Sequence, residues 1–222
     1  MSKPQLIYFP VRGRGEVIKL TFALAKADYD LVEPDRAAMK ADDAFLFGQA
    51  PRLQDGDLSV CQSNSILRYV GAKYALAGTT PREQCVVDMI CEGVEGLRGK
   101  YLALIYQAAL SAEAKEAYFK THIDKASVAS PNGGVHFLYL SKLLAQNKTG
   151  SGFAVGSAPT IADIAVFDIT DLHVRITDDK FAFTAEYPDL VAHHKLFSEL
   201  ACVKEYLASS ARLDRINAVP LG

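Results

Sequence analysis

The sequence lacks the cysteine and histidine patterns that zinc sites and thiol redox motifs require. Its four cysteines, Cys61, Cys85, Cys91 and Cys202, form no Cys-x-x-Cys pair, and its five histidines do not have the spacing of a zinc site. A dense disulfide framework is therefore not expected. This cysteine usage favours a reduced, cytoplasmic protein with no bound metal.

A strong charge of one sign and long hydrophobic runs are also missing. Lys and Arg number 24 and Asp and Glu 26, and the resulting formal net charge of −2 argues against a nucleic-acid partner. The most apolar late segment, residues 161–169, is interrupted by Asp163 and Asp168 and is too short for a membrane span, which needs ~20 residues. The first residues show no apolar segment followed by a small-residue cleavage site, so we expect no secretory signal.

What the 222 residues do have is the composition of a globular protein, 50% hydrophobic, with room for one large or two modest domains. The first third alternates between strand-like and helix-like periodicity. We predict, in order, a strand over 5–9, a helix over 16–27, a strand over 29–32, a hairpin over 53–62 turning at Asp55-Gly56, and a helix over 63–74. This order is typical of a small thioredoxin-like α/β unit.

A composition break at residues 77–81 separates this unit from a helical remainder. Thr80 and Glu83, with Pro81 between them, predict a helix start, and Thr160 with Asp163 predicts a second capping box. Helical stretches are predicted at 82–108, 112–123, 134–146, 160–176 and 189–208. We therefore expect an α/β domain over residues 1–78 and an all-α domain over residues 79–222.

Two conspicuous local features are interpreted as structural. Asp55-Gly56-Asp57 lacks the spaced ligands of a calcium loop and is expected to be a hairpin turn. His193 and His194, within the last helical stretch, are expected on a solvated helix face.

Five blocks of sequence, in the right order, resemble the cytosolic glutathione transferases, most of all the pi class. They are YFPVRGRG at 8–15, GQAPRLQDGDL at 48–58, QSNSILRY at 62–69, the segment 87–101 and the capping box at 160–163. The resemblance implies an N-terminal thioredoxin-like domain followed by an all-helical domain, which carries the electrophile site and much of the dimer interface. It also implies a homodimer.

The implied reaction is the attack of the thiolate of reduced glutathione, the co-substrate, on small hydrophobic electrophiles, an alkyl or aryl transfer of the detoxification type. A free thiol with a pKa near ~8.5 is only slightly ionised at neutral pH, so the enzyme must stabilise the sulfur anion. A phenol at the end of a strand can do so by donating its O–H, and Tyr8 matches the family's catalytic tyrosine. Packing of the strand end is the alternative role for Tyr8.

The resemblance also assigns residues that bind glutathione. Ser63 opens the predicted helix 63–74, and a helix N-terminus favours an anion, so Ser63 is expected to hold the γ-glutamyl carboxylate with Gln62 beside it. An ordinary N-cap is the alternative role for Ser63. Ala50, before an expected cis-proline at Pro51, should pair its backbone with the cysteinyl residue. The remaining contacts are expected from Arg14, Lys40 and Gln49.

The electrophile pocket and a dimer contact are implied in the same way. Phe9, Val11, Leu102 and Tyr106 match the pocket walls, and Tyr106 could also donate a hydrogen bond to a developing oxyanion. A core position is the alternative role for Tyr106. Phe47 takes the place of an aromatic that inserts between helices of the partner subunit, as in a symmetric homodimer.

Departures from the family affect the glycyl end of glutathione. The chain has no tryptophan, so the indole that the pi class directs to this end is missing. Asp42 aligns with the family's lysine for the glycyl carboxylate and would repel it, with Lys40 as the nearest substitute; Gly96 replaces an aspartate supplied by the partner subunit. Two alternatives stay open: a catalytically silent ligand-binding or structural relative, and a glutathione-dependent isomerase or peroxidase.

Overall fold

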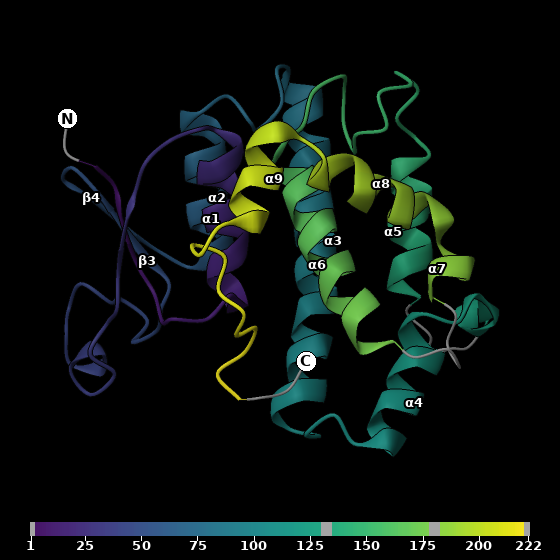
Figure 1. The fold of residues 1–222 in the computed structure, drawn as a ribbon, viewed down its shortest axis with the longest axis horizontal. Helices are drawn as coiled ribbons and strands as arrows, with labels where there is room; N and C mark the ends of the chain where they lie inside the picture. Colours follow the sequence, from purple (N-terminus) through teal and green to yellow (C-terminus); the bar gives the residue numbers. More distant parts are fainter. Residues whose placement is uncertain (1–2, 130–134, 178–182, 220–222) are drawn as a thin grey trace. The chain divides into compact units, whose positions relative to one another are not determined.

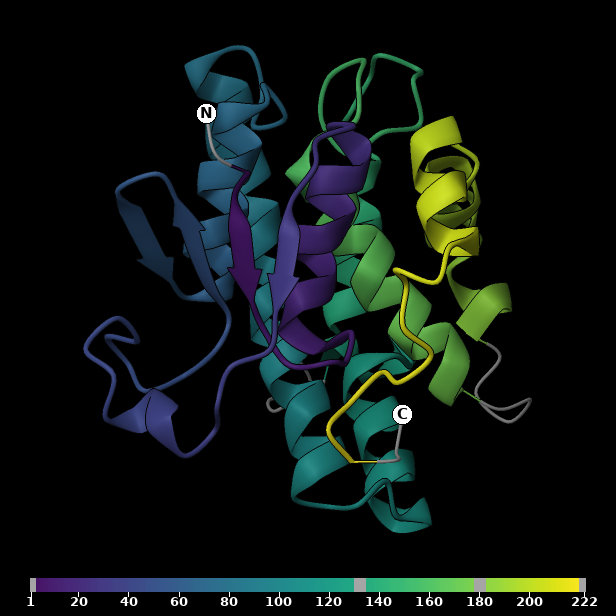
Figure 2. The same ribbon diagram turned by 60° about the vertical axis from the view of Figure 1, so that its left-hand side comes forward.

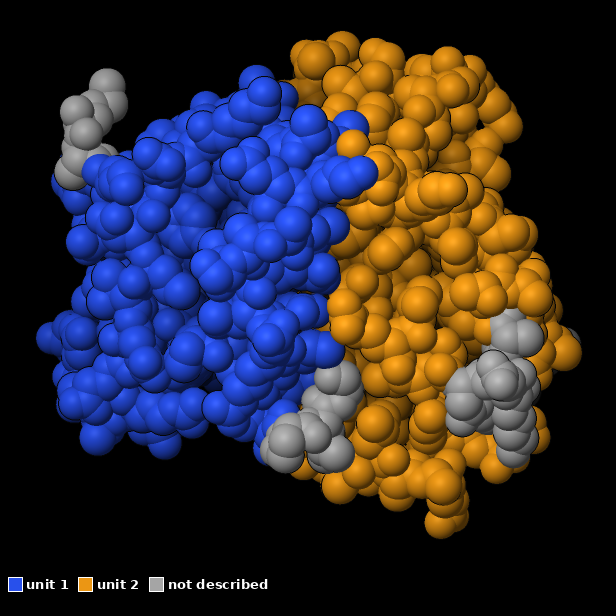
Figure 3. All heavy atoms as spheres, viewed as in Figure 1, with its two compact units in different colours: residues 1–76, 200–220 blue, residues 77–199, 221–222 orange. Residues whose placement is uncertain are grey.

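The computed structural model describes residues 3–129, 135–177 and 183–219. Contacts divide the chain into two compact units, coloured blue and orange in Figure 3. The first comprises residues 1–76 and 200–220, and the second residues 77–199 with 221–222. Residues 200–220 thus group with the N-terminal residues, although the expected boundary at residue 78 would assign them to the helical domain. The roles expected of the two domains stay predictions.

A small mixed sheet forms the first unit together with its helices. The strands are β1 (Gln5–Ile7), β2 (Asp30–Val32), β3 (Arg52–Asp55) and β4 (Leu58–Cys61), in the order β2-β1-β3-β4. β1 runs parallel to β2, as the neighbouring arrows in Figure 2 show, and antiparallel to β3, which pairs with β4. The hairpin turns at Gly56, whose φ of +61° is the left-handed conformation that glycine adopts readily. The predicted α/β arrangement is confirmed.

The helices of the first unit are α1 (Glu16–Leu24), α2 (Ser63–Lys73) and α9 (Ala201–Ala208). Short 3₁₀ turns, η1 (Gly13–Gly15) and η2 (Ala38–Lys40), precede α1 and follow β2. α1 contacts both α2 and α9, and its residues from Glu16 to Phe22 are buried. The helix is therefore buried on most sides, and the buried residues include the charged side chains of Glu16 and Lys19.

The second unit is helical in the described residues. It contains α3 (Pro81–Tyr106), α4 (Ala112–His122), η3 (Lys125–Ala129), α5 (His136–Leu144), α6 (Ile161–Ile176), α7 (Phe183–Glu186) and α8 (Pro188–Ser198). The green α6 runs alongside the teal α3 in Figure 1 and also contacts α8. Its residues from Ile161 to Thr170 are all buried, so α6 is the central helix of this core. None of the described helices combines the length and the apolar character needed to cross a bilayer.

Both predicted helix starts have the expected hydrogen bonds. The Thr80 hydroxyl accepts the Glu83 N–H at 3.2 Å, at the start of α3. At the start of α6, the Thr160 hydroxyl accepts the Ala162 N–H at 3.3 Å and the Asp163 carboxylate accepts the Thr160 N–H at 2.8 Å. Because these contacts join residues two or three positions apart, local sequence is sufficient to predict them.

The prediction of a single helix over residues 189–208 is wrong. α8 ends at Ser198 and α9 begins at Ala201, with Leu200 extended between them at φ −60° and ψ 127°. Phe197 is fully buried in the second unit, whereas Val203 is fully buried in the first. The break therefore lets the two helices pack into separate cores, although no glycine or proline marks it.

Candidate functional site

Tyr8 directly follows β1 at the start of the loop that leads to α1. Its backbone N–H donates to the Val32 carbonyl at 2.9 Å, and the side chain is buried, with 7% exposure. The Tyr8 hydroxyl oxygen accepts the backbone N–H of Arg14 at 2.9 Å. Because hydrogen bonds in a chain polarise one another, this N–H makes the Tyr8 O–H a stronger donor.

Two glycines allow the loop to close around the Tyr8 ring. A Cβ at Gly13 would lie 2.5 Å from the Tyr8 hydroxyl oxygen, and a Cβ at Gly15 would lie 2.5 Å from ring atom Cδ1. Gly13 also has a φ of +41°, in the left-handed region. The backbone can approach the tyrosine this closely only because these positions carry no side chain.

Ser63 is the first residue of α2 and is buried. Its hydroxyl accepts a long hydrogen bond of 3.4 Å from the Arg14 guanidinium. Arg14 therefore connects Tyr8, through its backbone, with Ser63, through its side chain. The first turn of α2 holds no acidic residue, so its N–H groups and helix dipole can receive an anion. Gln62, the N-cap, is exposed and has a φ of +72°.

The peptide bond between Ala50 and Pro51 is cis, as the resemblance implied. Ala50 is half-buried and packs, together with Phe9, against a small cluster formed by Ile7, Met39 and Phe45. Gln49 is exposed beside it. This cluster brings Ala50 and Phe9 together on the first unit.

The segment 36–42 carries a cation that the sequence interpretation missed. The Arg36 guanidinium carbon lies 4.3 Å from the centroid of the Phe9 ring, a cation–π contact. Lys40 is exposed at the end of η2. The Asp42 carboxylate accepts the Ala44 N–H at 2.8 Å, so it is engaged in its own turn. No sequence pattern marks Arg36, because its aromatic partner is distant along the chain.

The residues expected to line the electrophile pocket are divided between the two units. Val11 is buried and Phe9 half-buried in the first unit; Leu102 is half-buried and Tyr106 is 47% exposed on α3 of the second. Tyr106 is thus not a core residue of its unit, which removes that alternative. Phe47, the expected dimer contact, is 61% exposed in the single chain.

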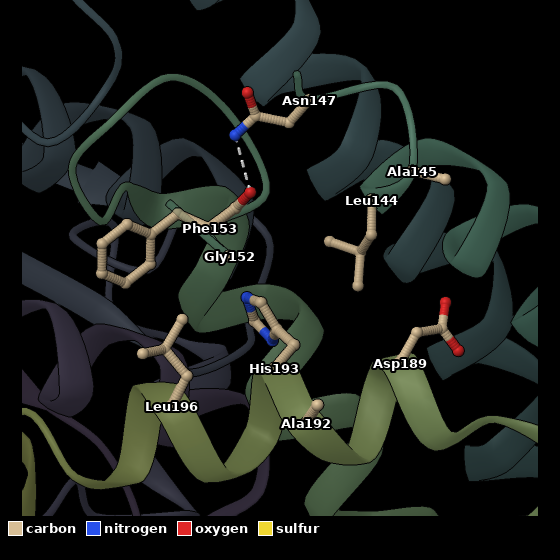
Figure 4. A pocket seen from close by; sticks show the side chains of 9 residues that line it. All are labelled: Leu144, Ala145, Asn147, Gly152, Phe153, Asp189, Ala192, His193 and Leu196. Carbon is tan, nitrogen blue, oxygen red and sulfur yellow. Dashed lines mark hydrogen bonds between the residues drawn. The ribbon is translucent and has the colours of Figure 1, made fainter. Parts of the chain in front are cut away.

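The expectation that His193 lies on a solvated face is wrong. His193 is buried, and its Nε2 lies 2.9 Å from Oδ1 of Asp163. It lines a cavity of about 460 Å³ in the second unit, between α8, the end of α5 and the loop that carries Phe153 (Figure 4). None of the predicted site residues lines this cavity. Within residues 3–129, 135–177 and 183–219, no three His, Cys, Asp or Glu side chains are grouped to hold a metal ion.

Comparisons with known proteins agree with the resemblance. The family model for the N-terminal domain of glutathione S-transferases matches residues 4–72, and the model for their C-terminal domain matches residues 96–210. Glutathione S-transferase P 1 of Xenopus laevis is 35% identical over 217 residues, which cover 95% of this chain and 94% of the relative. Glutathione S-transferase 2 of Onchocerca volvulus is 34% identical, and the match covers 91% of this chain and 90% of the relative.

Solved structures give the same result. The pi-class glutathione S-transferase of Onchocerca volvulus superposes with a TM-score of 0.75 at 30% identity, covering 93% of this chain and 92% of that one. The glutathione S-transferase of Ascaris lumbricoides superposes with a TM-score of 0.76 at 29% identity, and the match covers 93% of this chain and 97% of that one. Both domains and nearly the whole length are matched, so this chain belongs to the glutathione S-transferase family, enzymes that conjugate glutathione, and its relatives include the pi class.

Proposed function

We propose that the protein joins reduced glutathione to small hydrophobic electrophiles and that Tyr8 stabilises the reacting thiolate. The observation that carries this assignment is the 2.9 Å hydrogen bond from the Arg14 N–H to the Tyr8 hydroxyl oxygen. A Tyr8 O–H polarised in this way donates to the glutathione sulfur and lowers the pKa of the thiol. A shift of about two units corresponds to about 2.7 kcal/mol of thiolate stabilisation.

The reaction then needs no metal. The thiolate attacks the electrophilic carbon, a carbon–sulfur bond forms, and the leaving group departs with the electron pair of the bond that breaks. Where the electrophile is an activated double bond, the new carbanion instead takes a proton from solvent. Phe9 and Val11 of the first unit and Leu102 and Tyr106 of the second are proposed as apolar contacts for this substrate.

The γ-glutamyl end of glutathione is assigned to the start of α2. Ser63 offers a hydroxyl and a backbone N–H, and Arg14 adds a guanidinium 3.4 Å from the Ser63 hydroxyl. A carboxylate at this position gains from the helix N-terminus and from the arginine. Gln62 is proposed to contact the amino-acid end, and the backbone of Ala50 to pair with the cysteinyl residue, with Gln49 beside it.

The glycyl end is assigned to Arg36 and Lys40. The Arg36 guanidinium lies over Phe9, and Phe9 packs against the same small cluster as Ala50, the residue proposed to hold the cysteinyl backbone. Lys40 is exposed on the same segment. The Asp42 carboxylate accepts the Ala44 N–H, a bond that engages one of its oxygens within its own turn. The two cations thus compensate for the missing tryptophan and lysine.

We further propose a cytoplasmic homodimer, as the resemblance implies. Phe47 supports this, since an aromatic side chain 61% exposed on a single chain is a suitable anchor for a partner subunit.

The decisive experiment measures thiolate absorbance against pH for glutathione bound to the wild type and to Tyr8→Phe. We expect a bound thiol pKa about two units below that of free glutathione, returning towards the free value in Tyr8→Phe. Tight binding with an unshifted thiol pKa in the wild type would contradict the proposal and indicate a silent ligand-binding relative. Product analysis with a conjugation substrate and a peroxide then separates transferase from peroxidase activity.

A further inference from the structure

The loop that follows Tyr8 is bonded to the C-terminal segment of the chain. The backbone N–H of Arg12 donates to the Arg215 carbonyl and that of Gly13 to the Ile216 carbonyl, each at 2.9 Å. The Arg12 side chain adds a third bond, from Nε to the Leu213 carbonyl at 2.5 Å. All these residues belong to the first unit, and Figure 2 draws the segment after α9 in yellow.

A second set of buried polar contacts fixes the same loop to α1. The Lys19 side chain is fully buried, and its ammonium group donates to the Val11 carbonyl at 3.1 Å. Burial lowers the pKa of Lys19, with Glu16 opposing that shift. A buried cation is costly unless it is paired or hydrogen-bonded, so this contact is a specific constraint on the loop.

Glu16 joins α1 to the C-terminal segment. Its buried carboxylate accepts the Tyr206 hydroxyl at 3.0 Å and the Arg212 guanidinium at 3.3 Å. Tyr206 lies on α9, and Arg212 directly precedes the segment that bonds Arg12 and Gly13. The loop, α1 and the C-terminal segment therefore form one connected polar network.

We propose that Arg12 is a positioning residue for Tyr8 and that the segment Leu213–Asn217 is part of the framework of the catalytic loop. This inference rests on the proposed role of Tyr8. The segment holds two successive N–H groups, those of Arg12 and Gly13, and the next N–H, that of Arg14, meets the Tyr8 hydroxyl. Without these bonds the loop can rotate at Gly13, and the Arg14 N–H no longer polarises the tyrosine.

The test compares the pKa of the bound glutathione thiol in Arg12→Met with that in the wild type. We expect the thiol pKa to rise by about one unit and kcat to fall about tenfold, while the KM for glutathione changes less than about threefold because Ser63 is untouched. Arg175→Met, which removes an arginine paired with Asp171 in the second unit, is the matched control and should leave the thiol pKa unchanged. A lower melting temperature with an unchanged thiol pKa would show a merely structural role and overturn the proposal.

Arg12→Lys, which keeps a donor for the Leu213 carbonyl, should restore much of the thiol pKa shift.

A second pair of variants addresses the segment itself. A chain ended at Arg212 loses all three carbonyl acceptors, whereas a chain ended at Ala218 keeps them. Only the shorter chain should show the raised thiol pKa, and equal values in both chains would contradict the inference. Tyr8→Phe, measured alongside, separates the two proposals. If Tyr8→Phe raises the thiol pKa and Arg12→Met does not, only the positioning role fails.

Discussion

Arg36 allows the assignment of the glycyl end to be tested with a shortened substrate. γ-Glutamylcysteine lacks the glycyl carboxylate that Arg36 is proposed to bind. We predict that Arg36→Met raises the KM for glutathione about tenfold, as expected for one lost charge-assisted contact, and leaves the KM for γ-glutamylcysteine unchanged. Steady-state kinetics with both thiols checks this. An equal rise for both substrates would mean that Arg36 acts through Phe9 rather than through the carboxylate.

Gly13 leads to a prediction about the geometry of Tyr8. A Cβ at this position would meet the tyrosine hydroxyl oxygen at 2.5 Å, so Gly13→Ala must displace the loop or the ring. We expect kcat to fall about 10- to 100-fold, because a displacement of about 1 Å in a catalytic group has effects of this size. Rate measurements at saturating glutathione, with the thiol pKa as a second readout, test this.

Gly56 is the matched control for Gly13. Its φ of +61° imposes the same kind of backbone strain, but a Cβ there would have no atom within 4 Å. Gly56→Ala should therefore destabilise the fold by about 1–2 kcal/mol and leave kcat unchanged. If both variants lower kcat equally, strain rather than the approach to Tyr8 is the cause.

Single residues differ in how well sequence can place them. Tyr8 and Ser63 could be singled out from the sequence because a motif surrounds each one; the structure adds that both contact Arg14, and their roles stay predictions. The burial of His193 against Asp163 was not identifiable, because it depends on how α8 packs beside the start of α6. The cation–π contact of Arg36 was missed for the same reason.

The start of α6 depends on one carboxylate. Asp163 accepts the N–H groups of Ala154, at 2.6 Å, and Thr160, at 2.8 Å, and its Oδ1 lies 2.9 Å from the ring nitrogen of His193. We predict that Asp163→Ala lowers the free energy of unfolding by about 3–5 kcal/mol, because it leaves several buried donors unsatisfied. Urea denaturation measures this. Glu83→Ala at the exposed start of α3 is the control, and an equal loss there would contradict the argument.

His173 makes α6 sensitive to acid. Burial lowers its pKa to about 3, and its ring nitrogens contact the Tyr118 hydroxyl and the Ile169 carbonyl at 2.7 Å each. The unfolded chain binds a proton at this histidine below pH ~6.5 and the folded chain does not, so stability falls as pH drops from about 6.5 towards 3. At pH ~5 the loss is about 2 kcal/mol.

We predict that His173→Gln removes this part of the pH dependence. The measurement is the free energy of unfolding near pH ~7 and near pH ~5 for the variant and the wild type. His194→Gln controls for the loss of a histidine at a half-buried position of the same unit. A wild-type pH dependence that persists unchanged in His173→Gln would contradict the assignment.

Helix ends that are set by residues within one turn could be predicted from the sequence, whereas those set by packing against distant parts of the chain could not. Thr80 and Thr160 begin helices through contacts within one turn, and the structure confirms both. The end of α8 and the start of α9 have no such signal at Leu200, because the break arises from packing into two different cores. Periodicity alone therefore predicted one continuous helix where the structure has two.

The proposed homodimer can be tested through its expected anchor. Phe47 is 61% exposed in the single chain, and burying a large aromatic side chain contributes substantially to association. We predict that Phe47→Ser shifts the protein from dimer to monomer in sedimentation-velocity runs. Leu58→Ser, an exposed apolar position on β4, is the control that should stay dimeric. A wild type that sediments as a monomer would refute the dimer itself.

The first unit is interrupted in sequence by the second, and this affects the order in which the chain can fold during synthesis. Residues 77–199, most of the second unit, have been translated when residue 199 is added, whereas the first unit still lacks α9 and the carbonyl groups of residues 213–216. Domains that fold as they emerge usually do so from the N-terminus. Here the unit translated first is completed only after residues 77–199 have been added, so the carboxylate of Glu16 lacks the Tyr206 hydroxyl and the Arg212 guanidinium until those residues follow.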